Sequence, residues 1–322
     1  MRLTSLPVLA AVTAAVLAGC SSDDDPPGAA PSPAAPSTSA PAPTTDTSTA
    51  DTSTAEATTP DPAVAAALAQ LETDYAARLG VYAVDTGTRE TVEHRADERF
   101  AFASTHKALS AAAVLQATDA AALDDVIQYD AADVVGHSPV TEPAAGTGLT
   151  LLEVIRAAIT VSDNTAANLL FEQLGGPDGL EAAVRGFGDD TTSFDRIEPG
   201  LSDWAPGETR DTTTPRAMAA NLERLALGDL LAADDRAVLV DAMRDNTTGD
   251  ELIRAGVPDG WPVADKTGSA GHGGRNDIAV IEPPDSAPIV LAVYSNRLDP
   301  EAESDPALIA AAATIVVDAL TG

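Results

Sequence analysis

The chain carries Ser104-Thr105-His106-Lys107 at the start of a helical pattern that runs to Ala117. At positions i and i+3 of one helix, the serine hydroxyl and the lysine amine share a face and can meet. A serine near a helix N-terminus also has backbone N–H groups close by, which stabilise a developing oxyanion. An ordinary helix that contains a serine gives the same pattern, so this motif alone identifies no function.

Only two of the 18 basic residues are lysines, Lys107 and Lys266. A lysine amine can be pushed toward neutrality by burial and by its neighbours, whereas arginine stays charged in proteins. Codon bias could leave two lysines in the chain by chance, but two lysines present by chance would rarely both lie inside motifs. The amines at these two positions are therefore candidates for chemistry.

The second lysine opens the motif Lys266-Thr267-Gly268-Ser269, which follows an apolar pair in the pattern of a strand edge. Glycine permits close approach of another backbone, and an edge strand can pair with an extended substrate. A simple turn is the alternative interpretation.

A third motif, Ser162-Asp163-Asn164, follows a helical run over residues 151–159. A serine here can relay a proton, and an amide side chain can both donate and accept hydrogen bonds. The alternative is a plain helix N-cap, since Ser or Asp suits that position.

In this order the three motifs resemble the set of the serine β-lactamase and penicillin-binding superfamily, over about 260 residues. The resemblance implies an α+β fold, in which an antiparallel sheet flanked by helices is joined to an all-α lobe and the active site lies between the lobes. Periodicity independently indicates an α+β domain with an inserted helical lobe. The predicted helices are residues 63–79, 105–224 with an interruption at 189–214, and 305–320; the predicted strands are a hairpin from residue 81 onward, and the adjacent pair 278–281 and 289–294.

Residues 196–215 resemble the omega loop of class A β-lactamases. In that family the glutamate matched by Glu198 activates the water that hydrolyses the acyl-enzyme, and Arg196 and Asp211 match an ion pair across the neck of the loop. A long aperiodic loop inside a compact domain is usually functional. A cis bond is expected between Glu198 and Pro199. Without this resemblance, Glu198 would be interpreted as an ordinary exposed acidic residue.

The resemblance implies that Ser104 attacks the β-lactam carbonyl and that its proton goes to Lys107, or to Glu198 through a water; the sequence leaves both routes open. Backbone N–H groups of Ser104 and Ser269 are then expected to form the oxyanion hole. Ser162 is expected to pass a proton to the departing ring nitrogen.

Lys266 is expected to hold the local potential positive. The resemblance also implies that Asn164 binds the side-chain amide of the substrate, and that Thr267, Ser269 and Arg275 bind the substrate's carboxylate. The planar guanidinium of Arg275 offers a fork of donors that suits a carboxylate. No cofactor and no metal are expected. The four histidines show no metal-binding spacing, so they are expected to be solvated or packed: His94, His106, His137 and His272.

Two positions depart from the family pattern. Ser202 stands where an asparagine usually helps Glu198 hold the deacylating water, which predicts deacylation slower by roughly ten- to a hundredfold. His137 stands at what is usually an aromatic gate of the cleft, so substrate preference is expected to shift.

The N-terminus resembles a bacterial lipoprotein signal. Arg2 precedes an apolar stretch over residues 6–17, too short to span a membrane, and Leu-Ala-Gly-Cys ends at Cys20. We expect a signal peptide over residues 1–19, a lipid on Cys20, and a disordered Ser/Thr/Pro/Ala-rich tether over residues 20–60. An ordinary secretion signal with an incidental or buried thiol is the alternative. The enzyme-like domain is then residues 61–322, anchored to the outer face of a bacterial membrane.

The net charge of −32 disfavours nucleic acid and an anionic membrane surface as partners. The expected partners are β-lactam molecules and, through the lipid, the membrane; a monomer is the family default. The main alternative functions are a DD-peptidase, which lacks the deacylating glutamate, and a β-lactam sensor that is acylated without efficient release. Glu198 disfavours both, whereas Ser202 keeps the sensor open. An inert lipoprotein fits poorly with an intact motif set.

Overall fold

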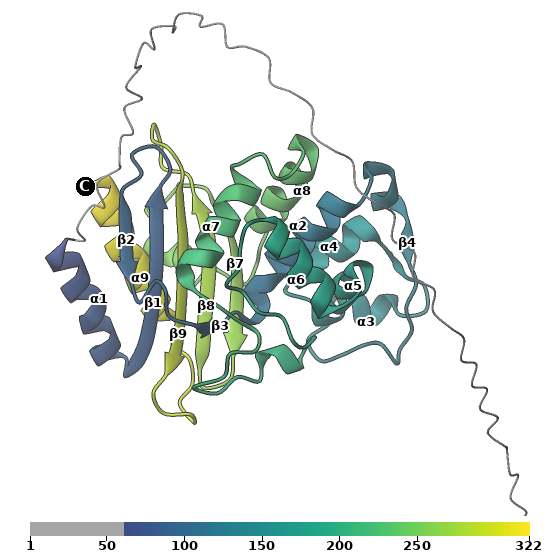
Figure 1. The fold of residues 1–322 in the computed structure, drawn as a ribbon, viewed down its shortest axis with the longest axis horizontal. Coiled ribbons are helices and arrows are strands. Elements are labelled where there is room, and N and C mark those ends of the chain that lie inside the picture. The colour runs from purple at the N-terminus through teal and green to yellow at the C-terminus, as the bar shows by residue number, and fades with distance from the viewer. Residues whose placement is uncertain (1–60) are drawn as a thin grey trace, which may run out of the picture. The chain divides into compact units, whose positions relative to one another are not determined.

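The computed structural model describes residues 61–322 (Figure 1). The predicted signal peptide, Cys20 and the predicted tether lie outside the described residues. Within residues 61–322, no helix is both long and apolar enough to cross a membrane.

A five-stranded antiparallel sheet joins the two ends of the folded chain, in the order β2-β1-β9-β8-β7 (Figure 1). The first strand pairs along its whole length with β9, with Val81 opposite Val293. The predicted hairpin and the predicted C-terminal strand pair are confirmed, and β7 lies at the edge of the sheet. The strands are β1 (Ala77–Asp85), β2 (Thr91–His94), β7 (Val263–Ala270), β8 (Gly274–Ile281) and β9 (Ile289–Arg297).

Alternation along the central strand divides the core in two. Ile289, Leu291 and Val293 join the hydrophobic cluster under α1 (Pro62–Asp74) and α9 (Pro306–Thr321), on one face of the sheet. The intervening residues of β9 join the larger cluster on the other face, with the remaining helices. A strand covered on both faces is apolar at successive positions, as this one is. The predicted helix over residues 305–320 is confirmed as α9.

The predicted first helix was wrong at its C-terminal end. It stops at Asp74, Ala76 has a positive φ of 45°, and β1 begins at Ala77. Leu79 fits a helical spacing from α1, but it is a strand residue opposite Ser295 and is fully buried. Pairing with β9 therefore overrides the helical pattern at the point where both fit.

The rest of the described chain forms the all-α lobe and the helices between it and the sheet (Figure 1). At its centre is α2 (His106–Ala117), buried without interruption from His106 to Leu115 because its residues are mostly small or apolar. The predicted run of helices is confirmed. It comprises α3 (Thr141–Ala144), α4 (Leu151–Thr160), α5 (Asn164–Leu174), α6 (Pro177–Gly186) and α7 (Pro215–Ala226). A further helix, α8 (Ala233–Arg244), follows beyond the predicted run.

The predicted interruption between α6 and α7 contains only a 3-10 turn and a two-residue strand. The short elements of the domain are β3 (Phe100–Ala101), β4 (Val126–Ile127), β5 (Leu149–Thr150), β6 (Thr212–Thr213), η1 (Ala103–Thr105), η2 (Ala120–Asp124), η3 (Gly200–Ser202) and η4 (Ile253–Gly256).

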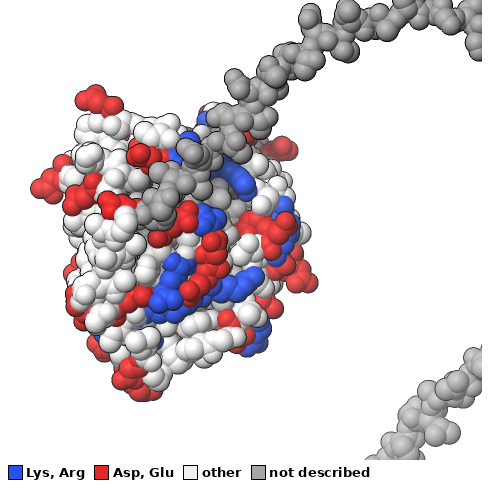
Figure 2. Space-filling view, turned by 60° about the vertical axis from the view of Figure 1, so that its left-hand side comes forward, with Lys and Arg blue, Asp and Glu red and all other residues white. Residues whose placement is uncertain are grey.

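The acidic side chains share the surface of the domain with basic side chains. Figure 2 shows acidic side chains spread over one face, with basic side chains interleaved among them. Arginines near the β1–β2 hairpin are paired with acids: Arg95 with Glu72 and Glu98, and Arg216 with Glu93. Exposed pairs of this kind contribute little stability individually.

Candidate active site

A cleft of about 450 Å³ lies where the edge strand β7 meets the all-α lobe and the loop that carries Glu198. Lys107 and Lys266 are fully buried next to it. The structure thus brings the predicted motifs together, and Thr248 is the only lining residue that the sequence did not indicate. The lining residues are Ser104, His137, Ser162, Asn164, Glu198, Pro199, Ser202, Thr248, Thr267, Gly268, Ser269 and Arg275.

Ser104 lies in the 3-10 turn η1, directly before α2. Ala103 has φ 46°, a left-handed conformation that costs a non-glycine residue about 1–3 kcal/mol and that clusters at functional sites. The turn packs against β7 so closely that a Cβ at Gly268 would lie 3.0 Å from the Phe102 carbonyl oxygen. The close approach predicted at Gly268 therefore involves the turn that presents Ser104.

Lys107 lies one helical turn after Ser104 and contacts four oxygens. Its Nζ donates to Asn164 Oδ1 at 2.6 Å, to the Ser162 carbonyl at 2.8 Å and to Ser162 Oγ at 3.3 Å. It also forms an ion pair with Glu198 Oε1 at 3.1 Å. Burial lowers the pKa of the Lys107 amine, and the Glu198 carboxylate opposes this shift.

Lys266, on β7, contacts the same serine as Lys107. Its Nζ donates to Ser162 Oγ at 3.0 Å and to the Thr267 carbonyl at 2.9 Å. No carboxylate of the described residues lies within ion-pair distance of this amine. Burial, together with the charge of Lys107, lowers the pKa of Lys266 to about 7. Ser162 Oγ therefore accepts from two buried amines.

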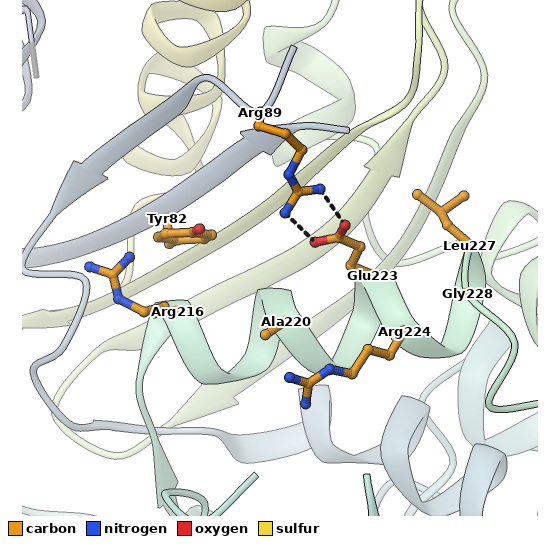
Figure 3. A pocket seen from close by; sticks show the side chains of 8 residues that line it. All are labelled: Tyr82, Arg89, Arg216, Ala220, Glu223, Arg224, Leu227 and Gly228. Carbon is orange, nitrogen blue, oxygen red and sulfur yellow. Dashed lines mark hydrogen bonds and ion pairs between the residues drawn. The ribbon is translucent and has the colours of Figure 1, made fainter. Parts of the chain in front are cut away.

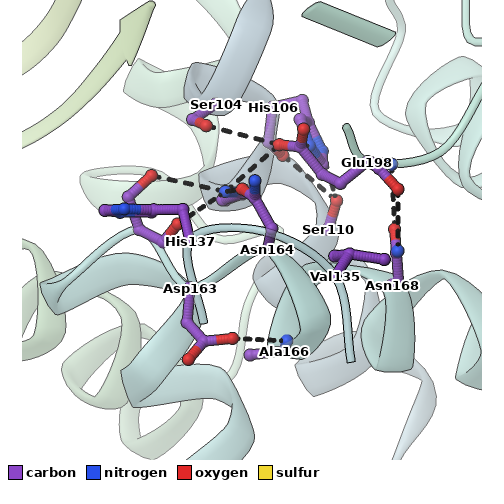
Figure 4. Close-up of polar contacts among 12 residues, drawn as sticks. Ser104, His106, Ser110, Val135, His137, Asp163, Asn164, Ala166, Asn168 and Glu198 are labelled. Atoms are coloured by element: carbon purple, nitrogen blue, oxygen red, sulfur yellow. Dashed lines mark hydrogen bonds and ion pairs between the residues drawn. The ribbon is translucent and has the colours of Figure 1, made fainter. Parts of the chain in front are cut away.

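Glu198 directly contacts the serine that was expected to be the nucleophile. Ser104 Oγ donates to Glu198 Oε1 at 3.3 Å, the same oxygen that pairs with Lys107 (Figure 4). Burial raises the pKa of the Glu198 carboxyl, but contacts with His106 and Lys107 outweigh it and lower this pKa to about 2. The carboxylate is charged at neutral pH, the form in which it can accept a proton.

The backbone around Glu198 is fixed by a residue that the sequence analysis missed. Asn168 on α5 donates from Nδ2 to the Glu198 carbonyl and accepts from the Glu198 N–H, both at 2.9 Å (Figure 4). The peptide bond from Glu198 to Pro199 is cis, as predicted. Asn168 is four residues after Asn164, on the same helix face, and this spacing was the available signal.

The neck of the loop is closed by the predicted pair Arg196 and Asp211. Arg196 Nε lies 2.5 Å from Asp211 Oδ2, and Asp211 Oδ1 accepts from the backbone N–H groups of Asp195 and Arg196 at 2.9 and 3.0 Å. Asp211 is completely buried, whereas the Arg196 side chain keeps 23% of its surface exposed. This arrangement fixes both ends of the segment that carries Glu198.

The N-cap interpretation of the third motif is confirmed, and the residues on either side of the cap lie at the cleft. Asp163 is the N-cap of α5 and accepts from Ala166 N at 2.9 Å, while its other carboxylate oxygen accepts from backbone N–H groups at the start of α3. Ser162 and Asn164, on either side of this cap, line the cleft. Ser162 has φ 57°, so the cap turns the serine out of a relaxed backbone conformation.

The far end of the cleft presents donors suited to an anion. Arg275 Nη1 donates to Ser269 Oγ at 2.5 Å, and Ser269 faces Arg275 across the β7–β8 pair. Thr267 Oγ1 lies 2.6 Å from Thr248 Oγ1. Hydroxyls and a guanidinium together match the hydrogen-bonding needs of a carboxylate.

The two departures from the family pattern both line the cleft. His137 has φ 62°, and its Nε2 lies 3.1 Å from the Val161 carbonyl oxygen, so the ring lies against the segment before Ser162. Ser202 ends the 3-10 turn η3 after Pro199, and its carbonyl accepts from Gly271 N at 2.9 Å.

His106, which was not among the predicted site residues, also lies beside Glu198. It is packed, as predicted, but its ring Nε2 lies 3.6 Å from Glu198 Oε1. His106 belongs to the first motif, and that position was the available signal. Among residues 61–322 no group of three or more His, Cys, Asp or Glu side chains is arranged to hold a metal ion.

A second cavity, of about 460 Å³, lies between β1 and α7 (Figure 3). Two of its three arginines are paired with acids: Arg89 pairs with Glu223 at 2.5 Å, and Arg216 pairs with Glu93 while stacking over the Tyr82 ring. The third, Arg224, donates to the Phe187 carbonyl. This cavity contains none of the predicted site residues.

Comparisons with known proteins agree with this geometry. The profile of the Beta-lactamase enzyme family matches residues 63–320. A β-lactamase of Amycolatopsis lactamdurans is 56% identical over 261 residues, covering 81% of this chain and 86% of the relative. The solved class A β-lactamase of Clostridium kluyveri superposes with a TM-score of 0.80 at 45% identity, covering 81% of this chain and 100% of that one.

A solved halotolerant bacterial β-lactamase has a TM-score of 0.78 at 48% identity, covering 79% of this chain and 98% of that one. Fold, motif order and relatives agree over the whole described domain. The chain belongs to the class A β-lactamases.

Proposed function

We propose that this protein hydrolyses β-lactam antibiotics, penicillins and cephalosporins, through a serine acyl-enzyme. The observation that carries the proposal is one carboxylate oxygen, Glu198 Oε1, which contacts both Ser104 Oγ and Lys107 Nζ. An adjacent base activates a serine that is otherwise a weak nucleophile. Of the two base candidates, Glu198 contacts the hydroxyl directly, and Lys107 contacts the same Glu198 oxygen.

In acylation, Ser104 Oγ bonds to the β-lactam carbonyl carbon while its proton passes to Lys107 or Glu198. The carbonyl oxygen becomes an oxyanion next to the N–H groups of Ser104 and Ser269, and the packing of η1 against β7 at Gly268 supports this placement. The carbon–nitrogen bond of the ring then breaks. The nitrogen takes a proton through Ser162, which the buried amines contact from both sides.

In deacylation, Glu198 accepts a proton from a water whose oxygen attacks the ester carbonyl. The bond to Ser104 Oγ breaks, and the serine regains its proton. The charged state of Glu198 and the Asn168 clamp on its backbone both support this role. Asn164 and the group of Thr267, Ser269 and Arg275 hold the substrate's amide and carboxylate.

The test is a time course with a chromogenic cephalosporin in large excess over purified protein, with intact-protein mass read at each point. Sustained turnover that disappears in Ser104→Ala is the expected result. A single stoichiometric burst with a persistent adduct contradicts the proposal and identifies a β-lactam sensor or a penicillin-binding protein.

We also propose that the protein acts as a lipid-anchored monomer on the outer face of a bacterial membrane. The support is the sequence ending at Cys20, which resembles a lipobox. Expression with a labelled fatty acid is expected to label the wild type and to leave Cys20→Ser unlabelled and released into the medium. A wild type that is secreted without label contradicts the anchor.

A further inference from the structure

The histidine of the first motif contacts the carboxylate on which the proposed hydrolysis depends. His106 is completely buried at the start of α2, with its ring 5.5 Å from Phe102 and 5.1 Å from Phe171, centroid to centroid. Two aromatic neighbours hold the plane of the ring, and they leave only its edges for polar contacts. This packing explains a large side chain at the position, but it does not require a histidine.

One edge of the ring faces Ser110 and the other faces Glu198 (Figure 4). His106 Nδ1 lies 2.9 Å from Ser110 Oγ, and Nε2 lies 3.6 Å from Glu198 Oε1. This Nε2 is a buried polar atom without a hydrogen-bond partner among the described residues. Most buried polar atoms are hydrogen-bonded, so an unpaired one aimed at a reacting carboxylate calls for an explanation.

The tautomer follows from the single hydrogen of Ser110. That hydroxyl can donate either to His106 Nδ1, at 2.9 Å, or to the His106 carbonyl, at 3.2 Å. If it donated to the carbonyl, Nδ1 would carry the ring proton and the bare Nε2 would face a carboxylate oxygen. Two acceptors facing each other in a buried site repel. Donation from Ser110 to Nδ1 instead places the ring proton on Nε2, toward Glu198.

The ring is neutral at neutral pH. Burial lowers the pKa of His106, and Glu198 opposes that shift. The charged groups that face the ring are Glu198 from the loop, Lys107 from α2 and Lys266 from β7, and the two amines oppose its protonation. A neutral donor that stays in place while Glu198 gains and loses a proton is suited to hold the base in position.

We propose that His106 is a positioning residue for Glu198: its Nε2–H supports the carboxylate oxygen that activates the deacylating water, and Ser110 fixes the tautomer. The separation of 3.6 Å exceeds a normal hydrogen bond. Contacts of catalytic groups are often long before substrate binds and shorten in the reacting complex. This role rests on the proposed hydrolysis.

The test measures the deacylation rate of preformed acyl-enzyme between pH 2 and pH 8, a range that reaches the Glu198 pKa of about 2. His106→Phe keeps a ring between the two aromatic neighbours and removes the donor. We expect its acid limb to move up by about one pH unit, because a carboxylate without this donor protonates more easily. Deacylation at pH 7 is expected to slow about tenfold. His106→Gln retains an N–H near the position of Nε2 and is expected to restore the wild-type limb.

Two further variants keep the test decisive. Ser110→Ala leaves the ring in place and frees its tautomer, so a smaller shift in the same direction is expected even if His106→Phe does not fold. His94→Gln, on β2 outside the cleft, is the matched control for loss of a histidine. An acid limb that stays in place in His106→Phe, or in Ser110→Ala where the former does not fold, overturns the proposal. A wild type without turnover refutes the hydrolysis itself.

Discussion

The two lysines of this chain share one serine and differ in their partners. Both amines are fully buried and both donate to Ser162 Oγ, but Lys107 has the Glu198 carboxylate at 3.1 Å, whereas Lys266 contacts only neutral oxygens. Burying a charge costs less free energy when a charge of opposite sign lies beside it than when it has no such partner. Lys107 is part of an ion pair. The charge of Lys266 has no such partner among the described residues, so we expect it to destabilise the folded state.

The largest expected effect comes from removing the paired amine. Lys107→Met leaves the Glu198 carboxylate buried without its ion-pair partner, so we expect a loss of about 3–5 kcal/mol in the free energy of unfolding. Because a proton-transfer group is also lost, turnover is expected to fall by about 10²- to 10⁴-fold. Chemical denaturation and steady-state hydrolysis measure the two effects. A variant as stable as the wild type would show that the pair is not the reason Lys107 is tolerated.

Removing the unpaired amine is expected to change stability in the opposite direction. Folding lowers the pKa of Lys266 from 10.5 to about 7, so between these values the unfolded chain holds a proton that the folded protein has released. Wild-type stability therefore rises with pH across that window. Lys266→Met is expected to gain about 1–3 kcal/mol below pH 7, with the gain shrinking toward pH 10. Unfolding curves at pH 6 and pH 9 measure this, and a loss at pH 6 would contradict the comparison.

A change beside Glu198 is expected to affect the part of the site that contains the Lys107–Glu198 ion pair, and not the part around Lys266. Ser202→Asn restores an amide next to the position of the deacylating water, so deacylation is expected to accelerate by roughly tenfold, with acylation unchanged. Burst kinetics separate the two steps. Unchanged or slower deacylation would mean that Ser202 is not the reason for any slow release.

The smallest expected effect is a change in the pH dependence of kcat/KM, caused by the titration of Lys266. With a pKa of about 7, Lys266 loses its charge at mildly alkaline pH, so kcat/KM for a carboxylate-bearing β-lactam is expected to decline above that value. Lys266→Arg stays charged, and its decline is expected to begin at higher pH, with a maximum within about tenfold of the wild type. A pH–rate profile from pH 5 to pH 10 is the measurement. A decline at the same pH in both proteins would assign it to another group.

The sequence allowed the fold class and most of the cleft to be predicted because motifs record chemistry at fixed spacing. The strand pair at residues 278–281 and 289–294 was predictable since strands buried on both faces are continuously apolar. The end of the first helix was not, because Leu79 fits both the helical spacing and the strand, and only pairing with β9 decides between them.

The missed site residues share a cause. Asn168 and His106 act on Glu198 from other elements, and no local pattern shows that α5 and the loop meet. Thr248 reaches Thr267 from a connecting segment without any motif. Side chains that support a catalytic group through tertiary contacts are determined by packing, which a single sequence records only weakly.

The burial of both lysines also makes the domain a reporter of its own opening. Amine-reactive acylating reagents need an exposed, neutral amine, and neither lysine side chain of the chain is exposed in the folded domain. Each lysine that opens to solvent adds one label of known mass. Apart from the label on the N-terminal amine, the rate at which each lysine gains its label therefore measures how often that lysine becomes exposed, without any engineered probe.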